Sequence, residues 1–295
     1  MADAGIVAQI RAFLTPEFSN KSFTLRFTYN DVMYTTSFKA SHVGDTITID
    51  QGCVTMTLEP VGFIGQIQSN SPGKGCFSPT LVSDPRDKVG RRTTSADVLQ
   101  ILKTKLGLAF PTDTDITIYD GARIVETSDD GSPTMISPFH LLRGGKAFYE
   151  KYGYSSPIIN DLKVKLETFP WSECTEDAKS VILDCRPETH LDGELLTDIM
   201  KKISWEDEVA FNNRQERSLS YRVFRQFALK QGISLEDSTQ FEQTPVWKFL
   251  LNKDSPEWIQ CDKDLQFTLF TETTNSAQST RRRKKRARKA SRCRR

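Results

Sequence analysis

One stretch of the chain combines residue types that could bind an anion, and it spans residues 139–154, FHLLRGGKAFYEKYGY. Gly144 and Gly145 free the backbone just before residues 146–152, which we predict to form a short helix. Gly153 stands where a left-handed residue would end that helix. The spacing therefore predicts a glycine-opened turn, a short helix and a glycine cap.

Basic side chains flank the N-terminus of this predicted helix. The first N–H groups of a helix have no partner within it, and they carry the positive end of its dipole. Together with Arg143 and Lys146, they could hold a phosphate group. Phe148 and Tyr152 are four residues apart and share one helix face, whereas Tyr149 points elsewhere. The alternative is a packed helix that closes a domain, in which the glycines serve only the turn.

A second stretch with anion-binding character covers residues 83–95, SDPRDKVGRRTTS. This loop leads into a predicted amphipathic helix over residues 96–106, which ends at Gly107. Point charges and free N–H groups converge at such a helix start, which suits a polyphosphate. A solvated basic turn is the alternative. The basic residues of the loop are Arg86, Lys88, Arg91 and Arg92.

The C-terminal tail, residues 281–295, is strongly basic. It holds 11 Lys and Arg residues and no acidic residue, which leaves 29 basic against 38 acidic side chains in the rest of the chain. We expect this low-complexity run to be disordered, after a flexible linker over residues 271–280. The run predicts binding to nucleic acid or to an import receptor, and a nuclear location; a solvated arm is the alternative. Its first part is Arg281, Arg282, Arg283, Lys284, Lys285, Arg286, Arg288 and Lys289.

The 6 cysteines and 3 histidines form no metal-binding motif, because no pair of them is close-spaced. The N-terminus shows no signal-peptide pattern, so we expect an intracellular protein with reduced cysteines that pack as small apolar side chains. No apolar run is long enough to cross a membrane. The sequence therefore predicts no metal, no membrane segment and no thiol chemistry.

The first half of the chain is expected to form an α/β domain of the α+β type with a mostly antiparallel sheet. Alternating apolar residues predict strands, and turn-forming dipeptides separate them. Strands that are neighbours in sequence would pair as a meander, with the predicted helix 96–106 packed against the sheet. Leu99, Leu102 and Leu106 would then be buried, with Phe148 beside them. The expected strands are residues 22–29, 32–38, 46–50, 54–58, 63–68, 76–82 and 115–119.

A break at residues 155–157, Ser-Ser-Pro, is the expected domain boundary. The second half reads as mixed but mainly helical, with apolar faces typical of packed helices. It contains two expected strands, residues 162–169 and 258–270, and two expected helices, residues 191–203 and 214–230. The expected organisation is an N-terminal helix (1–20), an α/β domain (21–157), a mixed region of unknown role (158–270) and the linker with the tail (271–295).

The segment 147–154 also resembles the one that closes the acetyl-CoA domain of GNAT-type acyltransferases. In that family an alanine and an apolar residue precede Tyr-Glu-Lys, and Gly-Phe follows after one residue. Here the pattern is filled by Ala147, Phe148, Tyr149, Glu150, Lys151, Gly153 and Tyr154. The expected order of strand, phosphate-binding turn, helix and strand before it is similar as well. More loosely, the chain resembles uncharacterised proteins of large DNA viruses, which implies a virion or a virus factory as another location.

The GNAT resemblance implies transfer of an acetyl group from acetyl-CoA to an amine. Tyr149 would be the general acid that protonates the departing thiolate. The general base would come from Glu59, Asp84 or another carboxylate on the sheet, and main-chain groups of residues 80–82 would hold the pantetheine arm. The implied cofactor-binding residues are Val82, Gly90, Arg91, Arg92, Thr93 and Thr94.

Two departures from the family pattern support a second hypothesis. Arg92 stands where the family has a small residue against the pyrophosphate, and the family's frequent Asn before the last helix is missing. The chain would then be a catalytically inactive GNAT-like scaffold that associates with nucleic acid through its tail. The sequence leaves the active transferase and the inactive scaffold both open.

Overall fold

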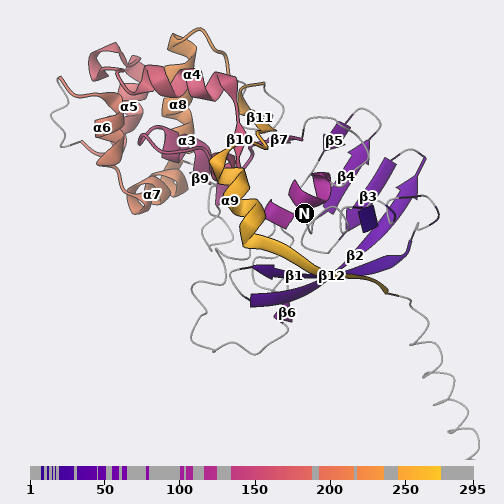
Figure 1. The fold of residues 1–295 in the computed structure, drawn as a ribbon. Helices are drawn as coiled ribbons and strands as arrows, with labels where there is room; N and C mark the ends of the chain where they lie inside the picture. Colours follow the sequence, from indigo (N-terminus) through magenta and orange to yellow (C-terminus); the bar gives the residue numbers. More distant parts are fainter. Residues whose placement is uncertain are drawn as a thin grey trace, which may run out of the picture. The chain divides into compact units, whose positions relative to one another are not determined.

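The computed structural model divides the chain into two compact units (Figure 1). The sheet unit consists of residues Met1–Ile116 and Gln260–Arg295, and the helical unit is the segment Thr117–Ile259. The expected boundary near residue 157 differs from this division, because strands on both sides of it pair with each other. The structure describes residues 20–29, 32–44, 46–50, 55–59, 62–64, 78–79, 100–102, 104–108, 116–124, 134–187, 193–215, 218–235 and 245–273, and a few single positions before residue 20.

The sheet unit contains an antiparallel meander, as the sequence predicted. Its strand order is β12-β1-β2-β3-β4-β5, and β6 pairs with β2. Each described pair of strands is antiparallel, and the C-terminal strand β12 completes the sheet beside β1. The strands are β1 (Ser22–Tyr29), β2 (Val32–Val43), β3 (Thr46–Asp50), β4 (Thr55–Glu59), β5 (Gly62–Ile64), β6 (Ser78–Pro79) and β12 (Leu265–Thr273).

The alternation of apolar residues in β1 sets which face of this sheet is buried. Phe23, Leu25 and Phe27 are buried, and the ring of Phe23 stacks on that of Phe38 in β2 at 5.4 Å between centroids. Arg26, on the other face, is exposed. Alternate residues of β1 therefore lie on a buried and a polar face, as is usual in antiparallel sheets.

Residues 100–102 and 104–108 are helical, which agrees with the expected helix 96–106 over its described part, but the helix continues past its expected end at Gly107. Leu102 and Leu106 are buried as predicted, and Leu99 lies outside the described residues. The buried Lys105 donates through Nζ to the carbonyl oxygen of Asp262 at 2.7 Å and to that of Leu265. It also pairs with the Asp262 carboxylate at 2.9 Å. One cation thus satisfies two carbonyl groups where helix α9 (Pro256–Asp264) passes into β12.

The predicted strand over residues 258–270 was therefore wrong in its first half, which is helix α9. The helix start is local: Pro256 occupies its first turn, and the N–H of Trp258 donates to Ser255 Oγ at 3.1 Å. A serine cap followed by proline is a typical helix start. The apolar residues of the segment hid this signal.

In its described residues, the helical unit packs the helices α3 to α8 with short strands (Figure 1). Phe224 and Phe227 of α8 are buried, and the Phe224 ring lies 5.4 Å from that of Trp247 between centroids. The mainly helical character agrees with the prediction for the second half. The helices are α3 (Ile136–Leu141), α4 (Pro157–Leu166), α5 (Glu176–Cys185), α6 (Leu196–Lys201), α7 (Trp205–Gln215) and α8 (Leu219–Lys230).

The strand predicted over residues 162–169 is instead the second half of helix α4. Ser156 caps this helix by accepting from the N–H of Ile159 at 3.5 Å, and Pro157 occupies its first turn. Ile159, Leu162 and Leu166 are buried, at spacings of three and four, whereas Val164 is 67% exposed. The alternation in the sequence was real, but the helical period decides the burial.

The expected helix 214–230 is broken at Ser218. Helix α7 ends at Gln215, and Ser218 Oγ caps α8 by accepting from the N–H of Tyr221 at 3.3 Å. The expected helix 191–203 is shorter as well, because Leu195 forms an isolated bridge with Pro170 and α6 starts at Leu196. In both cases a long apolar pattern concealed a helix boundary.

A three-stranded antiparallel sheet in the helical unit has the order β10-β11-β7, and β8 pairs with β9 elsewhere in the unit. The expected strand 115–119 is present as β7, but it pairs with β11 rather than with the meander. The expectation of one α/β domain over residues 22–154 was therefore wrong. The strands are β7 (Thr117–Tyr119), β8 (Arg123–Ile124), β9 (Thr134–Met135), β10 (Tyr154–Ser155) and β11 (Lys248–Leu251).

Candidate functional site

The segment 139–154 has the backbone that its glycines predicted. Helix α3 ends in a turn at Gly144, and η2, a 3-10 helix over Phe148–Tyr152, follows. Gly153 caps it in the left-handed region, with φ of +84°. A Cβ atom on Gly153 would lie 2.5 Å from Trp258 Cβ, so a glycine is needed here for space as well as for conformation.

The N–H groups that were expected to hold a phosphate already have acceptors. Gly144 and Gly145 donate to the carbonyl oxygens of Leu141 and His140, at 3.0 and 2.9 Å, and so complete the end of α3. The N–H of Phe148 donates to Ser137 Oγ at 2.8 Å. The N–H of Ala147 donates to the carboxylate of Glu150. The phosphate cradle predicted from the glycines was therefore wrong, because two main-chain carbonyl groups and the side chains of Ser137 and Glu150 occupy its donors.

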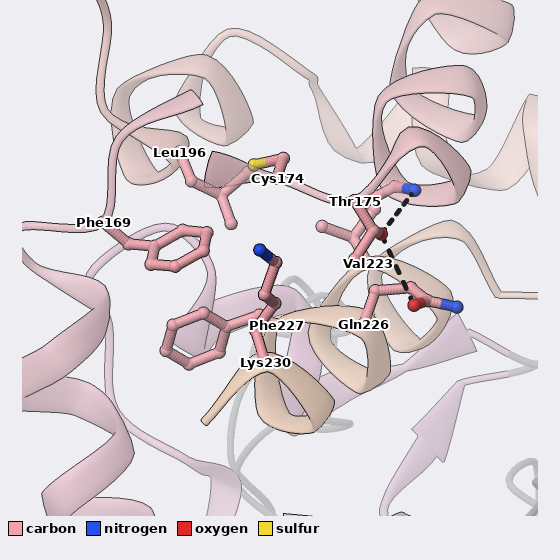
Figure 2. Close-up of a pocket in the computed structure, with 9 residues that line it drawn as sticks. Phe169, Cys174, Thr175, Leu196, Val223, Gln226, Phe227 and Lys230 are labelled. Carbon is pink, nitrogen blue, oxygen red and sulfur yellow. Dashed lines mark hydrogen bonds between the residues drawn. The ribbon is translucent and has the colours of Figure 1, made fainter. Parts of the chain in front are cut away.

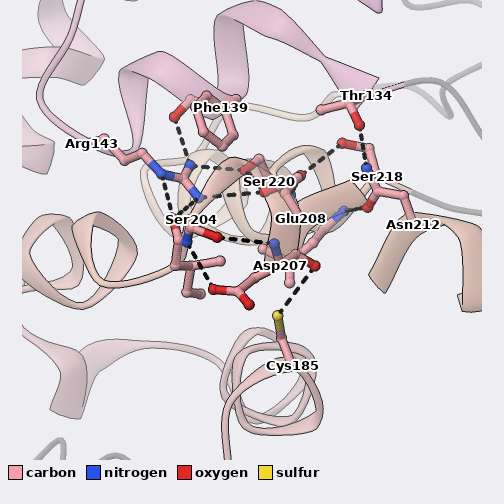
Figure 3. Close-up of polar contacts among 12 residues, drawn as sticks. Thr134, Phe139, Arg143, Cys185, Ser204, Asp207, Glu208, Asn212, Ser218 and Ser220 are labelled. Carbon is pink, nitrogen blue, oxygen red and sulfur yellow. Dashed lines mark hydrogen bonds and ion pairs between the residues drawn. The ribbon is translucent and has the colours of Figure 1, made fainter. Parts of the chain in front are cut away.

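Arg143, the cation expected beside that cradle, is also committed inside the helical unit (Figure 3). Its guanidinium lies 3.6 Å from the centroid of the Phe139 ring. It donates to the carbonyl oxygens of Phe139, at 2.8 Å, and of Ile203, at 3.1 Å. The neighbouring Lys146 pairs with Glu257 at 2.7 Å on the surface. Arg143 therefore supports the fold and does not face a ligand.

A buried polar network surrounds Arg143 and centres on Glu208 of α7 (Figure 3). Glu208 is fully buried and lies 3.5 Å from the guanidinium. It also accepts from the N–H of Ser220 at 2.8 Å and from Ser220 Oγ at 2.6 Å. Burial lowers the pKa of Arg143, against the opposing effect of Glu208. The network joins α3, α7 and α8, and it had no clear signal in the sequence because acidic residues on helices usually face solvent.

Tyr149, the implied general acid, lies in a cluster of rings. Its side chain is only 8% exposed. Its ring centroid is 5.0 Å from that of Phe148, 6.5 Å from that of Tyr152 and 6.1 Å from that of Tyr154. Edge-to-face and tilted rings at these distances stabilise a core. The geometry of Tyr149 is that of a packed residue, which agrees with the packed-helix alternative.

Asp120, which sequence reasoning missed, is a buried titratable group that is linked to this segment through Ser137. It follows β7, it is fully buried, and Ser137 Oγ and the N–H of Ala122, at 3.1 Å, donate to it. Burial raises its pKa from 3.8 to about 6, the two hydrogen bonds oppose the rise, and the charge of Glu150 adds to it. An aspartate that precedes glycine after a strand reads as a turn residue, so its burial had no clear sequence signal.

Of the other implied site residues, the candidate base Glu59 ends strand β4, and the rest lie outside the part of the chain that the structure describes. These are the cofactor-binding residues Val82, Gly90, Arg91, Arg92, Thr93 and Thr94, the candidate base Asp84 and the basic tail 281–295. Tyr149 belongs to the helical unit, whereas the cofactor-binding residues belong to the sheet unit. Acetyl-CoA binding therefore stays a prediction.

A narrow cleft with no room for a water molecule lies between α5 and α8 (Figure 2). Its walls are mostly apolar, and Lys230 lies at its edge. Burial raises the pKa of the Cys174 thiol to about 11, so this sulfur is protonated near neutral pH and is a poor nucleophile. The cleft residues are Phe169, Cys174, Thr175, Ala178, Leu196, Val223, Gln226, Phe227 and Lys230.

Among the described residues, no group of three or more His, Cys, Asp or Glu side chains is placed to hold a metal ion. Within the same part of the chain, no helix has the length and apolar character needed to cross a membrane. Comparisons with protein-family models, with curated proteins and with solved structures found no match to this chain. The function must therefore be argued from its own residues.

Proposed function

We propose that this protein associates with nucleic acid through its basic C-terminal tail, on a folded body that does no chemistry. The observation that carries the proposal is the charge distribution. Eleven cations and no acidic residue lie within residues 281–295, against 29 basic and 38 acidic side chains in the rest. A net negative body has no general attraction for a polyanion, so the tail supplies it.

The state of Tyr149 supports a scaffold more than a transferase. A general acid must reach the reacting atoms, at about 2.6–3.2 Å. Tyr149 is packed among Phe148, Tyr152 and Tyr154, with 8% of it exposed. The N–H groups of the same segment are bonded within the chain. The segment thus has the packing and the hydrogen bonds of a structural element of the helical unit.

The test is a salt titration of binding to a labelled DNA duplex by the full chain and by a chain without residues 281–295. Each neutralised phosphate releases counterions, so the affinity of the full chain should fall steeply with salt and show little sequence preference. The truncated chain should not bind. A variant with every tail arginine changed to lysine keeps the charge and should bind with a similar salt slope. Equal affinity of the full and truncated chains would contradict the proposal.

The same tail would direct the protein to the nucleus through an import receptor. Runs of five or more basic residues are typical of such signals, and residues 281–286 are all Lys or Arg. A fluorescently tagged full chain should enter the nucleus of a eukaryotic cell, and the truncated chain should stay outside it. An unchanged distribution would assign the tail to nucleic-acid binding alone.

The pattern over residues 147–154 favours a second candidate, transfer of an acetyl group from acetyl-CoA. If acetyl-CoA binds, a concentration of 100 times its dissociation constant should stabilise the full chain by about 2.7 kcal/mol in a thermal shift. Tyr149→Phe should then keep binding and slow the transfer, while Arg91→Ala with Arg92→Ala should weaken binding. Calorimetry that detects no binding of acetyl-CoA or CoA would remove this candidate and leave the scaffold.

A further inference from the structure

Asp120 has a buried carboxylate with which no described cation forms an ion pair. Its side chain is fully buried at the end of β7. Its two donors are neutral groups, Ser137 Oγ and the N–H of Ala122. Among the described side chains, no Lys, Arg or His pairs with it. Burial away from bulk solvent disfavours the ionised form of such a carboxylate, and no positive charge among the described side chains offsets this effect.

Ser137 connects this carboxylate to the segment Phe148–Tyr152. Its hydroxyl has one proton, which it donates to Asp120. Its oxygen also accepts from the N–H of Phe148, at 2.8 Å. The main chain of Asp120 is fixed as well, because its N–H donates to the carbonyl oxygen of Trp247 at 2.9 Å. Asp120 and Ser137 therefore join β7, α3 and η2 at one buried point.

The charged group that acts on Asp120 from η2 is Glu150, and its negative charge also disfavours ionisation of Asp120. Lys163 of α4 pairs with Glu150 at 2.9 Å. The carboxylate of Glu150 remains bonded to the N–H of Ala147. Lys163 thus pairs with Glu150, and the described ion pairs bring no cation to Asp120.

We propose that Asp120 is a proton-dependent lock on the segment Phe148–Tyr152, closed when Asp120 is neutral and loosened when it ionises. Loosening admits water to the carboxylate and breaks the bond between Phe148 and Ser137. It would also expose the rings of Tyr149 and Tyr152, which the closed state buries.

The direction follows from proton linkage. The pKa of Asp120 is raised from 3.8 to about 6 in the closed state, and solvation returns it toward 3.8. The closed state therefore binds a proton more tightly than the open state, and acid favours closing. The added stability is fully present below about pH 4, and it is lost as the pH rises through about 6.

Hydrogen exchange of the Phe148 amide in the full chain measures the lock. After correction for the intrinsic pH dependence of exchange, its protection should fall as the pH rises from about 4 to 7. The fall should approach roughly 100-fold, since the difference in pKa spans about two powers of ten. Protection of the Phe27 amide, in the sheet unit, should not follow this profile. A Phe148 protection that is constant over the range would overturn the proposal.

Three substitutions test whether Asp120 causes the pH dependence of the protection of the Phe148 amide. Asp120→Asn should give high protection of the Phe148 amide at every pH, because it is neutral and nearly isosteric. Glu150→Gln should keep the pH profile, with a small shift toward lower pH. Ser137→Ala should lower the protection of Phe148 throughout. If Asp120→Asn kept the profile, or Glu150→Gln abolished it, Asp120 would not be the sensor.

A titration of the wild-type chain gives the second measurement, which does not depend on any variant that fails to fold. The carboxyl carbon of Asp120, followed by NMR, should titrate with a midpoint near 6. A midpoint at the ordinary aspartate value of about 3.9 would overturn the lock, because burial would then place no penalty on the ionised form.

Discussion

Glu208→Ala is expected to lower the free energy of unfolding of the helical unit by about 3–5 kcal/mol, because it leaves a buried charge without its partner. Arg143 is 12% exposed and would lose its only described acidic partner. The N–H and the hydroxyl of Ser220 would also lose the acceptor that they now share. Unpaired buried donors add to the loss, because each gives up its water without a replacement.

Tryptophan fluorescence during urea unfolding measures this decrease in the free energy of unfolding, because it reports on the helical unit. The 4 tryptophans, Trp171, Trp205, Trp247 and Trp258, all lie in the helical unit, so the signal reports that unit and not the sheet unit. Glu206→Ala is the matched control, because Glu206 lies on the same helix and is exposed. It should change the stability by less than about 0.5 kcal/mol. Equal effects of the two substitutions would contradict the role of the network.

Gly153→Ala should be the second strongly destabilising change, for two independent reasons. The residue has φ of +84°, where an L side chain is strained by about 1–3 kcal/mol. Its new Cβ would also lie 2.5 Å from Trp258 Cβ and 2.6 Å from Ser255 Oγ. Forcing a methyl group into such a site typically adds about 1–3 kcal/mol. We expect a total of about 2–6 kcal/mol by the same fluorescence measurement.

Gly232→Ala separates the two reasons. Gly232 has φ of +78°, but a Cβ added there would meet no atom within 4 Å. This variant therefore carries the backbone strain alone, and the difference between the two variants measures the steric clash. If both variants lowered the free energy of unfolding by the same amount, the close approach of Trp258 to Gly153 would contribute nothing to the loss.

The parts of the fold that could be predicted are those set by residues close to one another in the sequence. The alternation of Phe23, Leu25 and Phe27 predicted β1 with its correct bounds, and Gly153 predicted its own left-handed cap. The errors came from segments with two compatible periods. The apolar residues of α4 fit a strand as well as a helix, and its start at Ser156 and Pro157 decided the outcome.

Pairing between distant segments was beyond such reasoning. Nothing near Thr117–Tyr119 indicates that its partner is Lys248–Leu251, so the division of the chain into its two units was not predicted. The site shows the same limit. The glycines predicted the turn before η2, but Ser137 and Glu150, which occupy its N–H groups, could be assigned only from the folded chain. The charge of the tail could be read from its composition, because it does not depend on contacts with other parts of the chain.

The pairing of β12 with β1 limits the order in which the two units can fold during synthesis on the ribosome. Strand β1 ends at Tyr29, and its partner β12 begins only at Leu265. The helical unit, Thr117–Ile259, is a continuous segment and is synthesised completely before that partner appears. Domains generally fold as units during synthesis, so the inserted unit can fold while β1 still has an unpaired edge. Such an edge is a template for pairing with other chains, so we expect a nascent chain to be open to such pairing until residue 265 and those after it have been made.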